Sequence, residues 1–308
     1  MNSLSPQLLS RASAPPNGDG WIHEIKYDGF RLMGRVDRGR VALVSRPGAD
    51  WTTRLPRIAE ALKSLAVDSC CMDGELVYLT NEGIPDFDEL QRATRKGDSL
   101  RLYYQVFDLL NLNGSDLTGL PLLERKQHLV ELLRRADHRL RFVTHIEGNG
   151  LDFFHAADQL GLEGIVSKRA RSVYRPGVRS SDWVKVKCFR SQSFTIAGYT
   201  TEMADGKMVL SSLALAATDN SGALCYAGRV EFGVPRRDRR LLLLLQSLGA
   251  APAETFGTRA GSAVSWVEPA LAAEVRCLAW RPGRQLRHAV LRRVNLSEAS
   301  SRTVLQGA

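Results

Sequence analysis

Short runs in which apolar and polar residues alternate make up much of the chain between residues 21 and 190. Because successive side chains of a strand point to opposite faces, this alternation predicts β-strands. The predicted strands cover residues 21–36, 39–46, 70–79, 100–112, 163–169 and 181–189. Apolar residues recur at helical spacing over residues 86–96, 123–136 and 151–161. Strands mixed with helices predict an α+β fold for this part of the chain.

The pattern changes close to residue 190. Further strands are predicted over residues 193–201, 207–218 and 223–232. An Asp-Gly pair and an Asp-Asn-Ser-Gly segment join these strands, and both favour the tight turns of hairpins. A leucine-rich helix over 236–248 and a last group of strands near 272–280 complete a small β-barrel. We therefore expect two domains, over residues 1–190 and 191–308.

The charge of the chain narrows the choice of partners. Among its 308 residues, 42 are basic and 33 are acidic, which gives a net charge of +9. This excess fits a polyanionic partner without identifying it. Of the basic residues 34 are arginine and only 8 are lysine. Lysine can lose its proton and arginine cannot, so the few lysines are the places to look for the chemistry of a primary amine.

Several classes of protein are disfavoured. No apolar run is long enough to cross a membrane, and the N-terminal residues lack the apolar core of a signal peptide, so we expect a cytoplasmic protein. Five cysteines without a C-x-x-C pair argue against a disulfide framework and against zinc. The sequence contains no G-x-x-x-x-G-K-[ST] segment, which argues against a P-loop ATPase.

The segment HEIKYDGFR holds the first candidate for chemistry. Strand alternation places Glu24 and Lys26 on one face and Ile25 on the other. Burial and neighbouring cations lower the pKa of a lysine side chain. Its neutral amine can then attack an electrophilic phosphate. Asp28-Gly29 between apolar residues is typical of an ordinary hairpin turn, which is the simpler interpretation of this segment alone.

Three carboxylates form the second candidate. In CMDGELVYL, Asp73 and Glu75 share a strand face, and Gly74 permits a close approach to the backbone. Glu163 begins the segment EGIVSKR. Carboxylates from separate strands are what a hard Mg²⁺ ion requires when it binds together with a phosphate substrate. The alternatives are an Asp-Gly turn and a surface glutamate at the start of a strand.

Two further segments carry candidates. In SDWVKVKC, the period of two places Trp183, Lys185 and Lys187 on one face. Their ammonium groups would lie about 7 Å apart and would bind a phosphate as point charges. The alternative is a solvated amphipathic edge strand. In YYQVFDLL, Phe107 beside Asp108 is by itself most simply an aromatic residue of the core.

The order of these motifs is more specific than any one of them. They are Lys-x-Asp-Gly-x-Arg at 26–31, Ser-Arg at 45–46, Asp-Gly-Glu at 73–75, Phe-Asp at 107–108, Glu-Gly-Ile-Val at 163–166 and Trp-Val-Lys-Val-Lys at 183–187. In this order they resemble the motifs of the covalent nucleotidyltransferases. The stretch from Glu163 to Cys188 looks like the ligase domain of the ATP-dependent DNA ligases of bacterial end joining. The resemblance covers nearly the whole chain and is stronger before residue 190 than after it.

The resemblance implies a fold and a reaction. The fold is a nucleotidyltransferase (adenylation) domain of antiparallel sheets with flanking helices, followed by an OB-fold β-barrel. In the reaction, a lysine takes AMP from ATP, AMP passes to the 5′-phosphate of a nick, and the 3′-hydroxyl displaces AMP and seals the strand. The barrel would close over ATP and then reopen to clamp duplex DNA, largely through the DNA backbone.

The resemblance also assigns roles to individual residues. Lys26 would be the nucleophile, and Lys185 and Lys187 would neutralise the α-phosphate as its charge rearranges. The other assignments are Glu24 and Phe107 to adenine, Arg31, Arg46 and Glu75 to ribose or phosphate, and Glu163 with Glu75 to Mg²⁺ or, as a substitute, Mn²⁺.

Two departures from the family pattern stand out. Pro47 replaces the asparagine that usually follows Arg46. Near the C-terminus, Asn295, Leu296, Ser297 and Glu298 stand where the family has Arg-x-Asp-Lys, the motif that orients the leaving pyrophosphate. Transfer of AMP from ATP is then expected to be slow. The alternative function is a degenerate ligase-like protein that binds nicks or ends with weak or no self-adenylation.

Other members of the superfamily fit less well. An RNA ligase or a capping guanylyltransferase would share the lysine chemistry, but residues 181–188 look more like a DNA ligase. An NAD-dependent ligase would carry a nicotinamide-binding segment before the lysine and a four-cysteine zinc module after the barrel. We expect a role in DNA repair and recombination by non-homologous end joining, in association with the nucleoid. The expected partners are duplex DNA with nicks or ends, a bacterial Ku-type end-binding protein, and separate polymerase and nuclease proteins.

Overall fold

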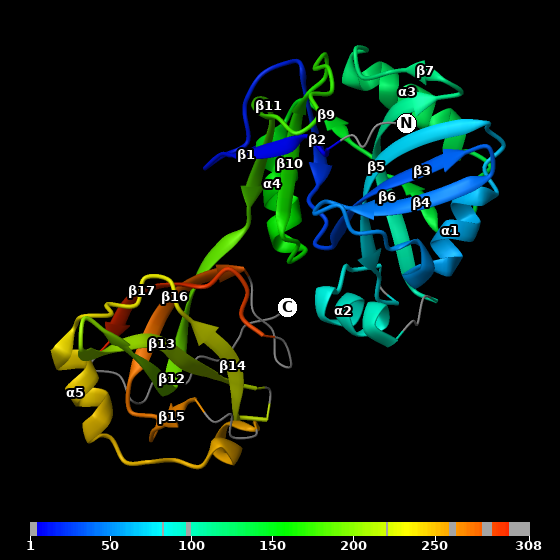
Figure 1. Cartoon of the computed structure of the whole chain (residues 1–308). Helices are drawn as coiled ribbons and strands as arrows, with labels where there is room; N and C mark the ends of the chain where they lie inside the picture. The colour runs from blue at the N-terminus through cyan, green and yellow to red at the C-terminus, as the bar shows by residue number, and fades with distance from the viewer. Residues whose placement is uncertain are drawn as a thin grey trace. The chain divides into compact units, whose positions relative to one another are not determined.

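The computed structural model describes residues 5–81, 83–96, 100–219, 221–258, 263–278 and 285–295. The chain forms two compact units, here named unit 1 and unit 2. Unit 1 ends at Cys188 and unit 2 begins at Phe189. In Figure 1, unit 1 is coloured from blue to green and unit 2 from green to red.

Unit 1 contains two β-sheets (Figure 1). In spatial order, the first sheet consists of β1 (Leu8–Arg11), β11 (Arg179–Lys187), β10 (Gly164–Arg169), β2 (Trp21–Ile25) and β9 (Ile146–Glu147). The second consists of β4 (Arg40–Ser45), β3 (Phe30–Asp37), β5 (Ser69–Tyr78), β6 (Leu102–Leu112) and β7 (Ser115–Asp116), with β8 (Leu140–Phe142) also beside β6. Neighbouring strands are antiparallel except for two pairs, β1 with β11 and β6 with β8.

One hydrophobic cluster joins the two sheets. It takes Ile22 and Trp183 from the first sheet and Met33, Cys71 and Leu110 from the second. All five side chains are buried, so the alternating apolar positions of the strands supply the core. The junction between the two sheets is therefore fixed by packing, and the residues beside it have defined positions.

Helices pack against both sheets of unit 1. They are α1 (Pro56–Lys63), α2 (Phe87–Lys96), α3 (Leu122–Leu133) and α4 (Gly150–Gln159), with a 3₁₀ turn, η1 (Thr52–Arg54), before α1. In α1, buried residues recur at positions three and four apart, which is the pattern of an amphipathic helix. Residues of α1, α2 and α3 join the core of the second sheet. Ala157 of α4 packs on Ile165 and Val186 of the first sheet.

The Asp28-Gly29 segment is not a hairpin turn, so that interpretation is wrong. β2 lies in the first sheet and β3 in the second, and the residues between them cross from one sheet to the other. A Cβ atom on Gly29 would overlap the backbone carbonyl of Leu76 in β5. Glycine is needed here because the backbone of the crossing segment touches β5.

The Asp73-Gly74 pair lies inside a strand, so the Asp-Gly turn is also wrong. Both residues belong to β5, which pairs with β3 on one side and with β6 on the other. A Cβ atom on Gly74 would lie 2.6 Å from the ring of Tyr104 and 2.7 Å from the carbonyl oxygen of Gln105. The close approach expected at Gly74 is therefore made by β6, the neighbouring strand.

Unit 2 is a small β-barrel. In spatial order it consists of β14 (Leu224–Val230), β13 (Lys207–Thr218), β12 (Phe189–Ala204), β16 (Ala272–Leu278) and β17 (Val290–Asn295), with β15 (Ser265–Trp266) also beside β12. A parallel bridge between Phe232 and Val290 joins the chain after β14 to β17 and closes the ring. A closed ring of five principal strands is the architecture of an OB fold. The expected α+β fold with a C-terminal OB barrel is confirmed.

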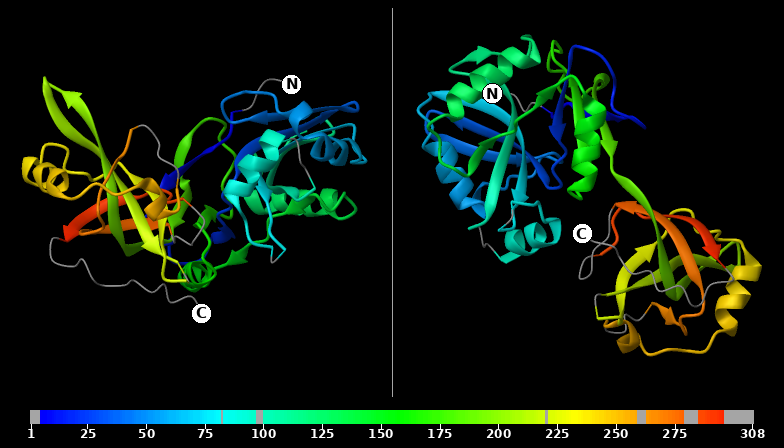
Figure 2. Two further views of the ribbon diagram at one scale, coloured as in Figure 1. Left: turned by 90° about the horizontal axis from the view of Figure 1, so that it is seen from below. Right: turned by 180° about the vertical axis from the view of Figure 1, so that it is seen from behind.

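One helix, α5 (Arg239–Ser247), lies against the barrel, as the two views of Figure 2 show. A short 3₁₀ turn, η2 (Ala253–Phe256), follows it. Asp238 caps α5, because its side chain accepts hydrogen bonds from the backbone N–H groups of Arg240 and Leu241, both at 3.0 Å. Among the described residues, none of the helices is long and apolar enough to cross a membrane.

Candidate active site

Lys26 lies immediately after β2, where the chain leaves the first sheet. Its backbone N–H donates to the carbonyl oxygen of Gly164 in β10 at 2.9 Å. Its Nζ forms an ion pair with Oε2 of Glu163, and Nζ of Lys187 lies 2.7 Å from Oε1 of the same carboxylate. The Glu163 side chain is only 5% exposed, so the interpretation as a surface glutamate is wrong. Glu163 is a bridge between two lysines.

Strand β11 brings a third ammonium group to the same place. Because β11 lies between β1 and β10, it is not the edge strand of the alternative interpretation. Burial lowers the pKa of Lys185, and the charges of Lys26 and Lys187 lower it further. Burial also lowers the pKa of Lys187, against the opposing effect of Glu163. Three ammonium groups near one carboxylate leave an excess of positive charge, which suits a bound phosphate.

Glu24 in β2 forms a second bridge of the same kind. Its Oε1 accepts a hydrogen bond from Nζ of Lys126 at 2.7 Å, and its Oε2 lies 2.6 Å from Nζ of Lys168. All three side chains are at most 3% exposed. Burial alone would raise the pKa of Glu24, but the two ammonium groups hold that pKa below its usual value. The sequence analysis missed Lys126, whose one signal was that lysine is rare in this chain.

The position of Lys126 depends on its neighbour Arg125 in α3. The Arg125 guanidinium donates two hydrogen bonds to the carboxylate of Asp108 in β6, both at 2.8 Å. It also donates to the carbonyl oxygens of Leu120 and Ser172 at 2.6 Å and 2.9 Å. The side chains of Arg125 and Asp108 are fully buried. This bidentate pair holds α3 against β6 and thereby directs Lys126 toward Glu24.

The ring of Phe107 has cations beside it. Nζ of Lys168 lies 4.3 Å from the ring centroid, and Cζ of Arg31 lies 5.4 Å from it. Trp183 meets the ring edge-on, with 6.3 Å between centroids. The stacking of adenine on Phe107 that the resemblance implies stays a prediction. If the base uses the face beside Lys168, that ammonium group has to move away from the ring.

Arg31 in β3 is held by Asp73 in β5. Its Nε and Nη2 donate to the two carboxylate oxygens at 2.9 Å and 2.6 Å. The hydroxyl of Tyr174 donates to the same carboxylate at 2.7 Å. Burial would lower the pKa of Arg31, and the charge of Asp73 overrides it and raises that pKa. The sequence analysis did not find Tyr174, which lies in a loop without a periodic pattern.

Glu75 and Glu163 are the residues predicted to hold a metal ion. Burial raises the pKa of Glu75 to about 7, although the charges of Lys26 and Arg31 lower it. Among the described residues, no group of three or more His, Cys, Asp or Glu could hold a metal ion by itself. Mg²⁺ commonly binds one or two carboxylates together with substrate phosphates. Glu75 lines the cavity together with Lys26, the partner of Glu163, so the two carboxylates fit that requirement.

A cavity of about 70 Å³ brings most of these side chains together. It is lined by Leu9, Glu24, Ile25, Lys26, Tyr27, Arg31, Glu75, Phe107, Val143, Val166, Lys168 and Trp183. Five of the nine residues predicted for the site are in this lining, and Glu163, Lys185 and Lys187 adjoin it through Lys26. Arg46 is not in this lining; it is exposed directly after β4, whose last residue, Ser45, pairs with Leu32 of β3.

Comparison with known proteins places this geometry in a family. The family described as ATP dependent DNA ligase domain matches residues 7–187, and the ATP dependent DNA ligase C terminal region matches residues 206–295. The chain therefore belongs to the ATP-dependent DNA ligases.

Particular relatives narrow the comparison. The multifunctional non-homologous end joining protein LigD of Pseudomonas aeruginosa is 38% identical over 293 residues, which are 93% of this chain and 35% of that protein. The SPbeta prophage-derived DNA ligase-like protein LigB of Bacillus subtilis is 34% identical over 210 residues, which are 68% of this chain and 75% of that protein. The chain spans 35% of the length of LigD from Pseudomonas aeruginosa and 40% of the length of LigD from Mycobacterium tuberculosis.

Solved structures show the same similarity. The ligase domain of LigD from Mycobacterium tuberculosis is 30% identical, with a TM-score of 0.57 and 96% of each chain covered. A mycobacterial DNA ligase D in complex with ATP and MES is 31% identical, with a TM-score of 0.56 and the same coverage. The similarity to ligase D therefore extends over both units of this chain.

Proposed function

We propose that the chain seals nicks between 5′-phosphate and 3′-hydroxyl ends in DNA, using ATP and a lysyl-AMP intermediate on Lys26. One observation carries the proposal: Lys26 lies at the cavity in an ion pair with Glu163, beside Lys185 and Lys187. A primary amine next to charges that stabilise a phosphate is suited to attack on phosphorus.

The first step would form the covalent intermediate. Nζ of Lys26 attacks the α-phosphorus of ATP, the P–N bond forms, and the bond to pyrophosphate breaks. Lys185 and Lys187 stabilise the charge that builds up on the α-phosphate oxygens. Nζ of Lys26 has to lose a proton to the solvent and leave its ion pair with Glu163 before the attack, because an ammonium group has no free electron pair.

The nucleotide would be held by the remaining predicted residues. Glu24 and Phe107 contact adenine, and Arg31 with Glu75 contacts ribose or phosphate. The fixed guanidinium of Arg31 is suited to this, since a preorganised cation loses little freedom when it binds a phosphate. Arg46 follows Ser45, the cross-strand partner of Leu32, and would also contact ribose or phosphate.

Glu75 and Glu163 would hold Mg²⁺, with Mn²⁺ as a substitute. When bound, the ion neutralises phosphate charge and makes the phosphorus a better electrophile. Lys187 would stabilise the α-phosphate beside it.

The later steps would act on DNA. AMP passes from Lys26 to the 5′-phosphate, and the 3′-hydroxyl displaces AMP. The OB barrel of unit 2 would hold duplex DNA mainly through its phosphates, in line with the net charge of +9. The LigD relatives are named for non-homologous end joining. We infer a role in that repair pathway, at nicks or ends on the nucleoid, with a Ku-type end-binding protein and separate polymerase and nuclease proteins as partners.

The second candidate function is binding to nicks or ends with weak or no self-adenylation. It is favoured by the altered C-terminal motif. Asn295, at the end of β17, begins this segment, and Leu296, Ser297 and Glu298 lie outside the described residues. Because pyrophosphate leaves only in the first step, a change in this motif affects that step and spares the later ones.

Single-turnover measurements on two substrates test the proposal. We expect slow formation of lysyl-AMP from ATP and Mg²⁺, and faster sealing of a nick that already carries 5′-AMP. Lys26→Arg provides the control for the covalent step. Failure to seal a 5′-phosphate nick with ATP, together with failure to seal the nick that already carries 5′-AMP, would refute the ligase proposal. That result would favour the binding protein. Adenylation as fast as sealing would show that other residues orient the pyrophosphate.

A further inference from the structure

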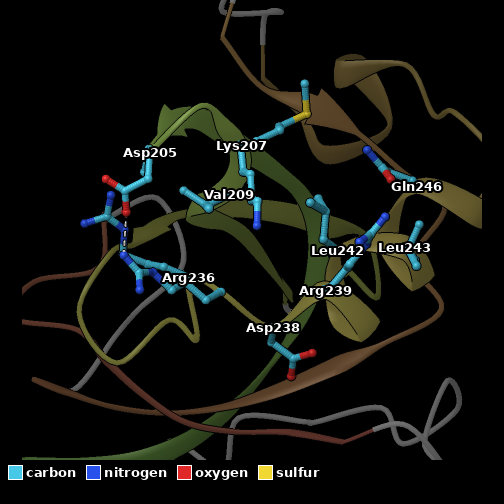
Figure 3. A pocket seen from close by; sticks show the side chains of 12 residues that line it. Asp205, Lys207, Val209, Arg236, Asp238, Arg239, Leu242, Leu243 and Gln246 are labelled. Atoms are coloured by element: carbon cyan, nitrogen blue, oxygen red, sulfur yellow. Dashed lines mark hydrogen bonds and ion pairs between the residues drawn. The ribbon is translucent and has the colours of Figure 1, made fainter.

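A groove in unit 2 is lined by residues that have no assigned role in the proposed ligase chemistry. It lies between the β12–β13 turn and the N-terminal half of α5, and its volume is about 730 Å³. Figure 3 shows Arg236 on one side and Leu243 on the other, with Lys207 and Leu242 between them. The groove is thus bordered by both charged and apolar side chains.

The apolar part of the groove comes from the run of five leucines in α5. Successive residues of a helix are about 100° apart, so five leucines in a row point to all sides. Three of them are buried in the barrel, whereas Leu243 is 55% exposed. Met208 in β13 is 54% exposed, and Met203, its cross-strand partner in β12, is 67% exposed. Exposed methionine and leucine side chains on one surface are typical of a site for another protein.

The charged part of the groove is mainly cationic. Four of its side chains are basic and two are acidic: Lys207, Arg236, Arg237, Arg239, Asp205 and Asp238. Arg236 pairs with Glu202, and Arg237 lies 2.7 Å from Asp205. Lys207 and Arg239 have no carboxylate partner within the part of the chain that the structure describes, so they remain available to a negatively charged ligand.

We propose that this groove binds an acidic amphipathic segment of a partner protein. The apolar face of the segment packs on Leu243 and Met208, and its carboxylates pair with Lys207 and Arg239. An amphipathic helix in an apolar groove is a common mode of peptide recognition. A second copy of this chain is disfavoured because each copy carries a net charge of +9. DNA is disfavoured because Asp205 and exposed apolar side chains share the groove.

A designed peptide provides the probe. It is a fluorescein-labelled helix with leucines at positions i, i+3, i+4 and i+7 and glutamates on the opposite face. Binding to the full chain is measured by fluorescence anisotropy. A peptide of the same composition in scrambled order, and one with lysines in place of the glutamates, serve as controls. We expect saturable binding of the acidic amphipathic peptide and at least about tenfold weaker binding of both controls.

Matched variants locate the binding. Leu243→Ser and Arg239→Glu are each expected to weaken binding about tenfold, in the range of single residues that matter at an interface. Leu160→Ser removes a leucine of unit 1 that is 63% exposed, and it is expected to have no effect. Thermal unfolding of each variant checks that the fold is retained. Formation of AMP adduct on Lys26 is expected to be the same in all three variants, so failure of docking and failure of the ligase proposal are distinguishable.

Four outcomes would overturn the proposal. Absence of saturable binding would do so, as would equal binding of the scrambled peptide. A duplex DNA whose affinity falls with Arg239→Glu and not with Leu243→Ser would assign the groove to DNA. Self-association in sedimentation that is lost in Leu243→Ser would assign it to a second copy. Binding that is weakened by both groove variants and unchanged by Leu160→Ser would establish the site.

Discussion

Two glutamates of unit 1 make the same kind of bridge in different surroundings. Glu24 joins Lys126 to Lys168, and the three side chains are at most 3% exposed. Glu163 joins Lys26 to Lys187, and these lysines are 17% and 14% exposed. Breaking a buried ion pair leaves an uncompensated charge, whereas a partly exposed pair can exchange partners more easily. The first bridge is suited to fix a position and the second to open.

The difference follows from what surrounds each lysine. Nζ of Lys126 lies 4.5 Å from the ring centroid of Phe142, and Nζ of Lys168 lies 4.3 Å from the centroids of both Phe107 and Trp183. Lys26 instead directly follows β2 and Lys187 ends β11, and both side chains are partly exposed. The same pair of residue types thus serves two purposes, and the exposure of the lysines separates them.

Lys26→Arg is expected to have the largest effect at the open bridge. Arginine keeps the charge and the ion pair with Glu163, but it does not act as a nucleophile because it keeps its proton. We expect no AMP adduct by mass spectrometry after incubation with ATP and Mg²⁺, and nearly unchanged binding of DNA. Lys63→Arg, at an exposed position in α1, is the control and should retain the adduct. An adduct on the Lys26→Arg protein would refute the assignment.

Lys126→Met tests the closed bridge. Removing one partner of a buried pair is expected to lower the free energy of unfolding by about 3 to 5 kcal/mol, because Glu24 is left with one lysine. Lys187→Met, at the open bridge, is expected to lower it by less than about 1 kcal/mol. Urea unfolding of the two variants measures both values. Equal losses would contradict the distinction between the bridges.

Substitutions of the β11 lysines are expected to change the activation free energy of AMP transfer. This change is expected to be smaller than the change that Lys126→Met makes in the free energy of unfolding. Lys185→Ala and Lys187→Ala should each slow AMP transfer on the order of 10²-fold, since removal of a preorganised charge has effects of that size. Val184→Ile changes the opposite face of the strand and should leave the rate nearly unchanged. Single-turnover reactions that are quenched at successive times give the rates of AMP transfer. Small and equal effects at all three positions would mean that the strand only supports the fold.

The pH dependence of the free energy of unfolding at Glu75 is expected to be smaller than the effect of Lys126→Met. The pKa of this carboxyl is about 7 in the folded protein against an ordinary value of 4.5. Between these pH values the unfolded chain loses the proton and the folded chain keeps it, so the group lowers the free energy of unfolding as pH rises. Glu75→Gln should therefore gain on the order of 1 to 3 kcal/mol over the natural protein at pH 8 and little at pH 4. Unfolding without ATP or metal measures this, and a gain independent of pH would contradict it.

Much of the fold could be predicted from the sequence. The long strands and the helices α2 to α5 follow from periodicity, which is a local property of the chain. Two kinds of feature could not be found in this way. Strand β1 has only four residues, and it pairs with β11 about 170 residues further along the chain. No local pattern in the sequence therefore predicts it. The Asp28-Gly29 turn was misread because a turn signal does not tell whether the flanking strands pair with each other.

The candidate site also contains residues that local motifs predict and residues that only the tertiary structure shows. The order of the motifs pointed to Glu24, Lys26, Glu163 and the lysines of β11, because these residues occur in short segments of distinctive composition. Lys126 was not predicted as a site residue, because a lysine in an amphipathic helix usually faces water. Only the tertiary structure shows that α3 is anchored by Arg125 and that its lysine is buried against Glu24.

The pairing of distant strands in the first sheet has a consequence for synthesis on the ribosome. Lys26 emerges early, but Glu163, its partner, is 137 residues further along, and β10 and β11 follow it. β2 lacks its neighbour β10 until residue 169 has emerged, and β10 lacks its own neighbour β11 until residue 187 has emerged. A nascent chain shorter than this would hold its nucleophile in an incomplete sheet, so it would not react with ATP. AMP bound to Lys26 would then mark the chains in which unit 1 has finished folding.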